Sequence, residues 1–159
     1  MNRAAACVAP RGPAWQIAPV RILALDVGSK RIGVAISDEL GRFAHPLSVL
    51  ARRGTARDVA AVAALCAERG VARVVVGIPS EPDGGEGHRA ARVRVLLDAL
   101  RAAGLAVDEC DEQYSTVEAE EVMLEAGLSR ARRKQVVDRA AAAVILERYL
   151  AARALVRRP

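Results

Sequence analysis

A single carboxylate interrupts an apolar segment early in the sequence. Asp26 stands between Leu25 and Val27 in the run 21–27 (RILALDV). Burying an ionised carboxylate among apolar side chains costs on the order of several kcal/mol unless a partner or a metal ion binds it. Asp26 is therefore a candidate metal ligand. The alternative is a structural turn residue, because aspartate is common beside glycine where a strand ends, and Gly28 follows closely.

A dense acidic cluster lies later in the chain. The segment 108–112 (DECDE) holds the carboxylates of Asp108, Glu109, Asp111 and Glu112. Like charges at this density repel one another unless a cation binds them. Alternation along a strand puts Asp108 on one side and Glu109 and Asp111 on the other. The alternative is a solvated strand end that binds no ligand.

A third acidic position lies on a helix. Asp138 falls on or beside an apolar stripe, because Ala141 and Ala142 follow one turn later. It needs a partner there, either a metal ion or an arginine such as Arg139 or Arg92. Carboxylates from separate elements are the ligands that Mg²⁺ or Mn²⁺ requires. Two such ions, roughly 3.5–4 Å apart, can hold the attacking water and the leaving oxygen of a phosphodiester.

Positive charge gathers near the end of the chain. Residues 129–159 contain nine basic and two acidic residues, whereas residues 21–128 contain 13 basic and 17 acidic ones. Cations at the start of a helix oppose its macrodipole at a cost of about 0.3–1 kcal/mol each. A bound phosphate backbone would offset that cost, and the alternative is a solvated basic turn. The candidate nucleic-acid-binding residues of this turn are Arg130, Arg132, Arg133 and Lys134.

The elements that must position these residues follow from the hydrophobic pattern. Three strands joined by short turns come first, and helices then alternate with strands. Pro46 makes the third strand an edge strand or a bulged one. The valine run at 74–76 indicates a central strand that is buried on both faces. The expected strands are 21–27, 31–37, 42–50, 71–78 and 105–110, and the expected helices are 55–69, 88–103, 115–127 and 129–152.

This order of elements predicts an α/β protein with the RNase H-like fold. Its five-stranded mixed sheet has three antiparallel strands followed by βαβα, and helices flank it. The length of 159 residues fits one domain. We expect a flexible N-terminal extension over 1–20, the folded domain over 21–152 and a basic tail over 153–159. No apolar run is long enough for a membrane span, and Cys66 and Cys110 fall in apolar patterns, which fits a reducing, cytosolic setting.

Four stretches resemble the YqgF/RuvX family in their order and spacing. They are LALDVGSKRIGVAISDELGRFAHPLSVL, GIPSEPDGGEG, DEQYSTVEAEEVM and SRARRKQVVDRAAAAVIL. The resemblance implies an RNase H-like nuclease, distantly similar to Holliday junction resolvases, in a family assigned to maturation of the 5′ end of pre-16S rRNA. The family's acidic positions match at Asp26, at Asp111-Glu112 and at Asp138. Two positions depart from the family, because Glu81 stands where Asn is frequent and Gln113 stands where Arg often follows the acidic pair.

The residues and the resemblance together predict a metal-dependent nuclease that uses Mg²⁺ or Mn²⁺. The expected substrate is structured RNA at the 5′ end of pre-16S rRNA, and the alternative is branched DNA cut by a Holliday junction resolvase. We expect a cytoplasmic monomer or homodimer without a membrane partner. The expected catalytic residues are Asp26, Glu112 and Asp138, the metal ligands are these three and Asp111, and the nucleic-acid-binding residues are Lys30, Arg31, Arg130, Arg132, Arg133 and Lys134.

Two other classes of function compete with this hypothesis. Residues 26–29 (DVGS) also resemble the first phosphate loop of actin-like sugar kinases. Those phosphotransferases need two such domains around one ATP, and this sequence has no second loop of that kind. The other class is a non-catalytic nucleic-acid-binding module that retains the fold. The carboxylates argue against it, because they repel phosphate unless a metal ion is bound.

Overall fold

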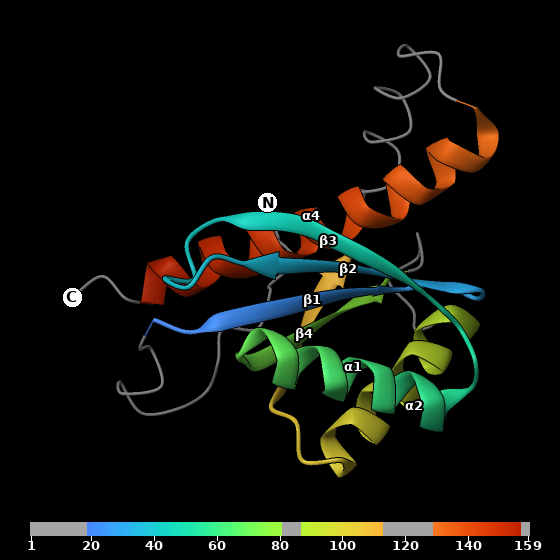
Figure 1. The fold of residues 1–159 in the computed structure, drawn as a ribbon, viewed down its shortest axis with the longest axis horizontal. Coiled ribbons are helices and arrows are strands. Elements are labelled where there is room, and N and C mark those ends of the chain that lie inside the picture. Colours follow the sequence, from blue (N-terminus) through green and yellow to red (C-terminus); the bar gives the residue numbers. More distant parts are fainter. Residues whose placement is uncertain (1–18, 81–86, 113–128, 157–159) are drawn as a thin grey trace.

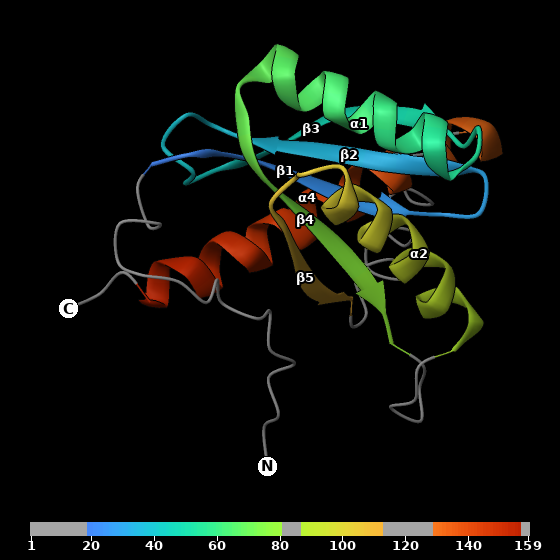
Figure 2. The same cartoon turned by 90° about the horizontal axis from the view of Figure 1, so that it is seen from below.

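A five-stranded sheet lies between two layers of helices (Figure 1). In this computed structural model α1 and α2 cover one face of the sheet, and α4 crosses the other face (Figures 1 and 2). The structure describes residues 19–80, 87–112 and 129–156, with positions 112, 130–139 and 155–156 described as backbone only. Most of the expected extension over 1–20 and the whole expected helix over 115–127 lie outside the described residues.

The order of the strands in the sheet is β3-β2-β1-β4-β5. β2 pairs antiparallel with both β1 and β3, whereas β4 runs parallel to both β1 and β5. The mixed sheet expected from the order of elements is therefore confirmed. The strands are β1 (Arg21–Val27), β2 (Arg31–Ser37), β3 (Ala44–Ala51), β4 (Val71–Pro79) and β5 (Val107–Glu112).

The expectations for the third and fourth strands also hold. β4 lies between β1 and β5, and its valines at 74–76 are almost fully buried on both faces. β3 is an edge strand, and its pairing with β2 passes from Val34 opposite Ser48 to Ala35 opposite Pro46. Leu47 is thus one extra residue in β3, which makes a β-bulge. Pro46 is tolerated because an edge strand with a bulge needs fewer backbone donors.

Within the described part of the chain, three helices pack against the two faces. They are α1 (Thr55–Arg69), α2 (His88–Ala102) and α4 (Arg130–Val156). The backbone N–H of Gly70, which has a φ of 64°, bonds the carbonyl of Cys66 and closes α1. One apolar core fills the space between the sheet and α1 and α2, and a second lies between the sheet and α4. Cys66 belongs to the first core and Cys110 to the second, as expected.

The bounds of three elements, β3, β5 and α4, differ from the expected ones by two residues or more. β3 begins at Ala44, because Oδ1 of Asp38 accepts the backbone N–H groups of Arg42 and Phe43 and holds them in a turn. β5 begins at Val107, because Leu105 donates back to Leu100 at the end of α2. α4 continues to Val156, past the expected end at residue 152. Within the described residues, no helix is long and apolar enough to cross a membrane.

Candidate active site

Asp26 lies near the carboxyl end of the central strand β1. Its neighbours Leu25 and Val27 belong to the core under α1 and α2, whereas Ala24 belongs to the core under α4. Alternation along the strand therefore places Asp26 on the face that α4 covers. Asp26 is partly exposed and pairs with Gly33 of β2. On the other side Gly77 follows Val76, the β4 partner of Leu25, so glycines stand directly across from Asp26 on both adjacent strands.

Two contacts fix the position of α4 along β5. Tyr149 donates a hydrogen bond to Asp108, and the sulfur of Cys110 lies 3.8 Å from the carbonyl oxygen of Ile145. From Asp108 to Cys110 the strand advances by two residues, whereas its contacts on α4 move back by four, from Tyr149 to Ile145. The helix and the strand therefore run in opposite directions. By this spacing, the beginning of α4 leads toward the carboxyl ends of the parallel strands. Asp138 lies in that part of α4, one turn before the buried Ala142.

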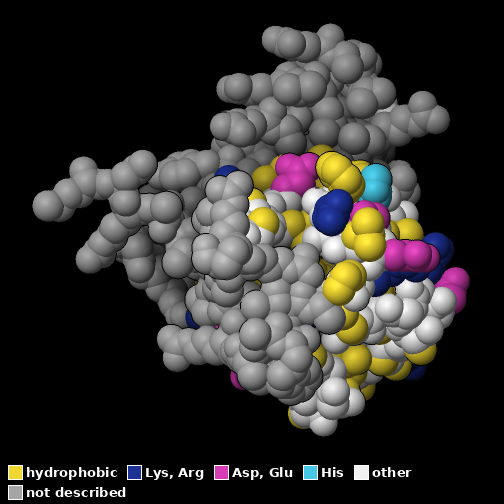
Figure 3. Space-filling view, turned by 90° about the vertical axis from the view of Figure 1, so that its left-hand side faces the viewer, with side chains coloured by type: hydrophobic (Ala, Val, Ile, Leu, Met, Phe, Trp, Pro, Cys, Tyr) yellow, Lys and Arg dark blue, Asp and Glu magenta, His cyan; other side chains and the backbone are white. Residues whose placement is uncertain are grey.

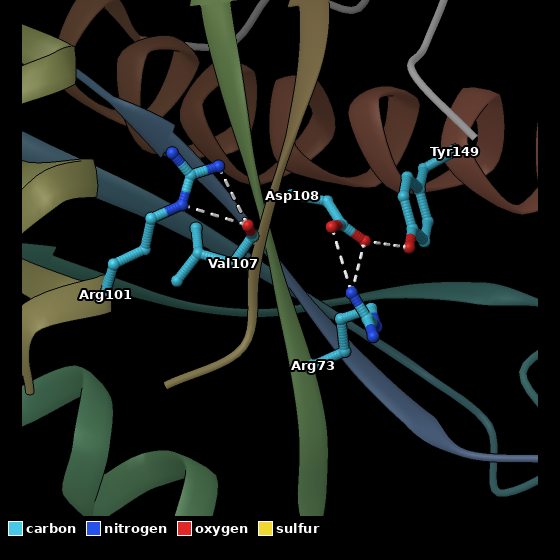
Figure 4. Close-up of polar contacts among 5 residues, drawn as sticks. All are labelled: Arg73, Arg101, Val107, Asp108 and Tyr149. Carbon is cyan, nitrogen blue, oxygen red and sulfur yellow. Dashed lines mark hydrogen bonds and ion pairs between the residues drawn. The ribbon is translucent and has the colours of Figure 1, made fainter. Parts of the chain in front are cut away.

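The acidic cluster of β5 is divided between the two faces of the sheet. Nη1 of Arg73 donates to Oδ1 and Oδ2 of Asp108 at 2.9 and 2.8 Å, and Tyr149 donates to Oδ2 (Figure 4). Glu109 points to the opposite face and forms an ion pair with Arg94 of α2. Burial and the nearby Asp108 carboxylate raise the pKa of the Tyr149 hydroxyl. Asp108 and Glu109 therefore hold helices to the sheet.

Asp111 lies on a different face from Asp26. It shares the alternation of Glu109, and its carboxylate accepts a hydrogen bond from the hydroxyl of Ser80. Glu112 ends β5 opposite Pro79, and its side chain, like that of Asp138, lies outside the described ones. Among the described side chains, no three of His, Cys, Asp or Glu lie close enough to hold a metal ion. The four-residue ligand set thus stays a prediction.

The turn after Asp26 is tightly held. The N–H of Gly28 donates to the carbonyl of Arg31 at 2.8 Å, and a Cβ at position 28 would lie 2.9 Å from that oxygen. Arg52, which follows β3, bonds this turn through its backbone N–H to Lys30 O and through Nη1 to Gly28 O, both at 2.9 Å. Nε of Arg52 also forms a 2.6 Å ion pair with Asp58 of α1.

The ion pair of Arg52 and Asp58 was not anticipated from the sequence. Asp58 is only 3% exposed, and its Oδ1 also accepts the backbone N–H of Arg53 at 2.9 Å. Both residues occupy ordinary polar positions in the sequence, after a strand and in the first turn of a helix. A signal was present nonetheless, because an aspartate in the first turn of a helix is favourably placed to accept backbone N–H groups.

A cleft of about 590 Å³ lies beside the same turn, on the side of α2. Its charged lining residues, among those described, are all basic. They are Lys30 and Arg31 from the turn, Arg52, and Arg89 and Arg92 from α2. The structure thus brings Lys30 and Arg31 together, as expected for nucleic-acid-binding residues, and adds three arginines that sequence reasoning missed. The predicted basic residues Arg130, Arg132, Arg133 and Lys134 lie in the first turns of α4, which extend beyond the sheet (Figure 1).

Comparisons with known proteins identify the family. The sequence pattern of the family described as "RuvX: Holliday junction resolvase" matches residues 20–152. The chain belongs to the RuvX family. A relative of this RuvX-family chain in Symbiobacterium thermophilum, named as a candidate pre-16S rRNA nuclease, is 49% identical over 136 residues, which are 85% of this chain and 94% of the relative. A protein of the same name in Moorella thermoacetica is 48% identical over 132 residues, 82% of this chain and 94% of that one.

A solved structure supports the fold of this RuvX-family protein. The structure of T. thermophilus RuvC in complex with a Holliday junction substrate matches with a TM-score of 0.51. The match covers 79% of this chain and 91% of RuvC at 19% sequence identity. Together with the strand order β3-β2-β1-β4-β5, the match confirms the RNase H-like fold.

Proposed function

We propose that this RuvX-family protein is a nuclease that hydrolyses phosphodiester bonds in structured RNA. The observation that carries the proposal is the place of Asp26. It is a partly exposed carboxylate near the carboxyl end of a central strand, on the face that α4 covers. In open α/β sheets this end of the strands is where ligands bind. The residues directly across from it, Gly33 and Gly77, are glycines, which permit close approach of a substrate to the strand.

The other proposed ligands belong to the same end of the sheet. Cys110 lies in the core under α4, and residues two apart on a strand share a face. Position 112 is therefore assigned to the same face as Asp26. The antiparallel course of α4 along β5 brings position 138 toward that end as well. We therefore assign Asp26, Glu112 and Asp138 as the residues that would hold Mg²⁺ or Mn²⁺, since hard cations prefer carboxylate oxygens. The bound cation would supply electrostatic stabilisation of the attacking and leaving oxygens.

Asp111 takes a different role in this proposal. Its hydrogen bond from Ser80 joins the end of β5 to the residue that follows β4. This contact fixes the position of the strand end that carries Glu112. We therefore treat Asp111 as a positioning residue, and the three other carboxylates as those that contact the reacting groups.

The relatives' names support a pre-16S rRNA substrate. Within that RNA we propose the 5′ end as the site of cleavage, and we propose the cytoplasm as the place of the reaction. The family description favours a second candidate, a branched DNA junction. Both substrates require the same phosphodiester chemistry. Purified protein is therefore incubated with hairpin RNA, with single-stranded DNA and with a four-way DNA junction, each with and without Mn²⁺. We expect metal-dependent cleavage that is strongest on the hairpin RNA.

The variant Asp26→Asn tests the assignment of the site. It keeps the size of the side chain and removes one charge, so cleavage should fall by orders of magnitude while the metal-free melting temperature holds or rises. Binding of RNA without metal should hold or improve for the same reason. The matched control is Asp98→Asn, in an exposed aspartate of α2, which should leave cleavage unchanged. Lost stability with intact cleavage would identify Asp26 as a structural turn residue.

A further inference from the structure

A second charged surface lies on the opposite side of the sheet from Asp26. Arg89 and Arg92 are exposed, and their separation of three residues places them on one side of α2. Both line the cleft beside the β1–β2 turn, which Lys30 and Arg31 also line. The cleft therefore combines cations from two elements that are far apart in the sequence.

Most of this positive charge is not compensated within the described residues. Lys30, Arg89 and Arg92 make no ion pair with any described side chain, and α2 has no acidic residue in its first turn. Arg89 in that turn opposes the helix macrodipole. The other end of the sheet carries charges of both signs. Asp38, Glu39 and His45 line a hollow there together with two arginines. Acidic side chains lie among apolar ones on this side of the molecule (Figure 3).

The cleft is also held in shape before any ligand binds. Arg52 lies at its wall and joins the β1–β2 turn to α1 through Asp58. Its own charge is therefore balanced, and it serves to position the turn that carries Lys30 and Arg31. A turn whose backbone is already fixed binds a polyanion with less loss of conformational freedom than a flexible loop does. The apolar side of Val95, which is 58% exposed, adds a surface against which a sugar ring can pack.

We propose that this cleft binds the sugar–phosphate backbone of the RNA beyond the bond that is cut, so that the substrate passes round the β1–β2 turn from the α4 face to α2. The proposal rests on the proposed nuclease function for the identity of the polyanion. Asp26 and Gly28 are two residues apart, so the carboxylate and the cleft lie on either side of one turn. Contacts to phosphate position a substrate without reading its sequence, so this surface favours long substrates of any sequence.

The test is RNA binding without divalent metal, which does not depend on cleavage. The dissociation constant of a labelled hairpin RNA is measured over a series of KCl concentrations for the full chain, for Arg89→Ala/Arg92→Ala and for Arg57→Ala. Arg57 is the matched control, because it is an exposed arginine in the first turn of α1, also a 15-residue helix, and lies outside the cleft. Melting temperatures verify that each variant folds.

The double variant should bind the hairpin roughly tenfold more weakly at 0.1 M salt, and its salt slope should fall by about two. Arg57→Ala should bind as the full chain does. An unchanged slope in the double variant, or an equal loss in the control, would overturn the proposal. Binding of a free nucleoside monophosphate is measured in the same way. If the double variant lost binding of the monophosphate but kept its affinity for the RNA, the proposal would also be overturned. Absence of cleavage with this binding pattern intact would count against the nuclease function alone.

Discussion

The residues around Asp26 combine a charged group with backbone that has little freedom to move. Asp26 stands two positions before Gly28, whose backbone N–H bonds Arg31 across the turn. Position 28 has no space for a side chain, because a Cβ there would meet the carbonyl oxygen of Arg31 at 2.9 Å. That oxygen is backbone and cannot swing away as a flexible side chain would. The turn geometry next to the carboxylate therefore depends on a glycine.

Replacing Gly28 with alanine tests this dependence. The added methyl group should open the turn and destabilise the fold by about 1–3 kcal/mol, as overpacking does. Cleavage should fall further than the loss of folded protein explains, because Asp26 moves with the turn. Thermal denaturation and cleavage rates measure the two effects, with the exposed Ser29→Ala as the control. A variant with wild-type melting and wild-type rate would show that the turn tolerates a side chain.

At the scale of elements, polar contacts decide how the helices are placed on the sheet. Arg73, Asp108 and Tyr149 anchor α4 to β4 and β5 (Figure 4). Arg101 of α2 donates a hydrogen bond to the carbonyl of Val107 in β5. α1 is anchored by Asp58 to the β1–β2 turn through Arg52. Both anchors add directional contacts between elements that also pack through the two apolar cores.

Removing the hydroxyl of Tyr149 tests the first anchor. Tyr149→Phe should lower the free energy of unfolding by about 1.5–3 kcal/mol at pH 7, the usual effect of losing a hydrogen bond to a charged group. The pKa of Tyr149 is raised in the folded protein, so the folded state keeps a proton that the unfolded state loses above pH 10. The stabilisation is therefore complete below pH 10 and declines above it.

Urea unfolding of the wild type and of Tyr149→Phe across this pH range measures the effect. The difference in the free energy of unfolding should be largest at neutral pH and should narrow above pH 10. If the difference in the free energy of unfolding stayed constant with pH, the contact with Asp108 would not raise the pKa of the Tyr149 hydroxyl.

Removing the carboxylate of Asp58 tests the second anchor. Asp58→Ala leaves the guanidinium of Arg52, which is 21% exposed, without its ion-pair partner. Loss of one member of a buried pair costs about 3–5 kcal/mol, which lowers the melting temperature by on the order of 10 °C. Asp98→Ala, at an exposed position on α2, should change melting little. Equal melting of the two variants would show that the ion pair contributes nothing.

For the molecule as a whole, charge is distributed around one end of the sheet. Asp26 lies on the α4 face, where we propose that Glu112 and Asp138 join it, and the basic cleft lies on the α2 side of the same β1–β2 turn. The first turns of α4, with their basic residues, extend beyond the sheet. We therefore expect a polyanion to contact the protein at two basic segments, the cleft and the beginning of α4.

The two surfaces should contribute independently to RNA binding. Alanine at Arg132, Arg133 and Lys134 should weaken binding across sequences and reduce the salt slope by about three. Combined with Arg89→Ala/Arg92→Ala, the losses in binding free energy should add, because separate elements carry the charges. The salt dependence of hairpin RNA binding measures this for each variant. Losses that do not add would indicate that one segment of RNA contacts both surfaces.

The sequence predicted local features better than contacts between distant elements. The bounds of β1, β2 and α1 were predicted correctly, because hydrophobic period and glycine mark them. The end of α4 was missed, since Arg153 looks like a tail residue yet is 2% exposed. Two sets of contacts were missed for one reason. They are the network of Arg73, Asp108 and Tyr149, and the grouping of Arg89 with Lys30. Both depend on which elements are neighbours in space, and strand order cannot be read from periodicity.

The bulge in β3 has a consequence for behaviour at high concentration. β3 ends one side of the sheet, and a regular edge strand can pair with the edge of another copy and start aggregation. Pro46 lacks a backbone N–H donor, and the extra residue Leu47 disturbs the even spacing of the other backbone donors and acceptors along β3. These two residues thus discourage association of copies of the protein along that edge.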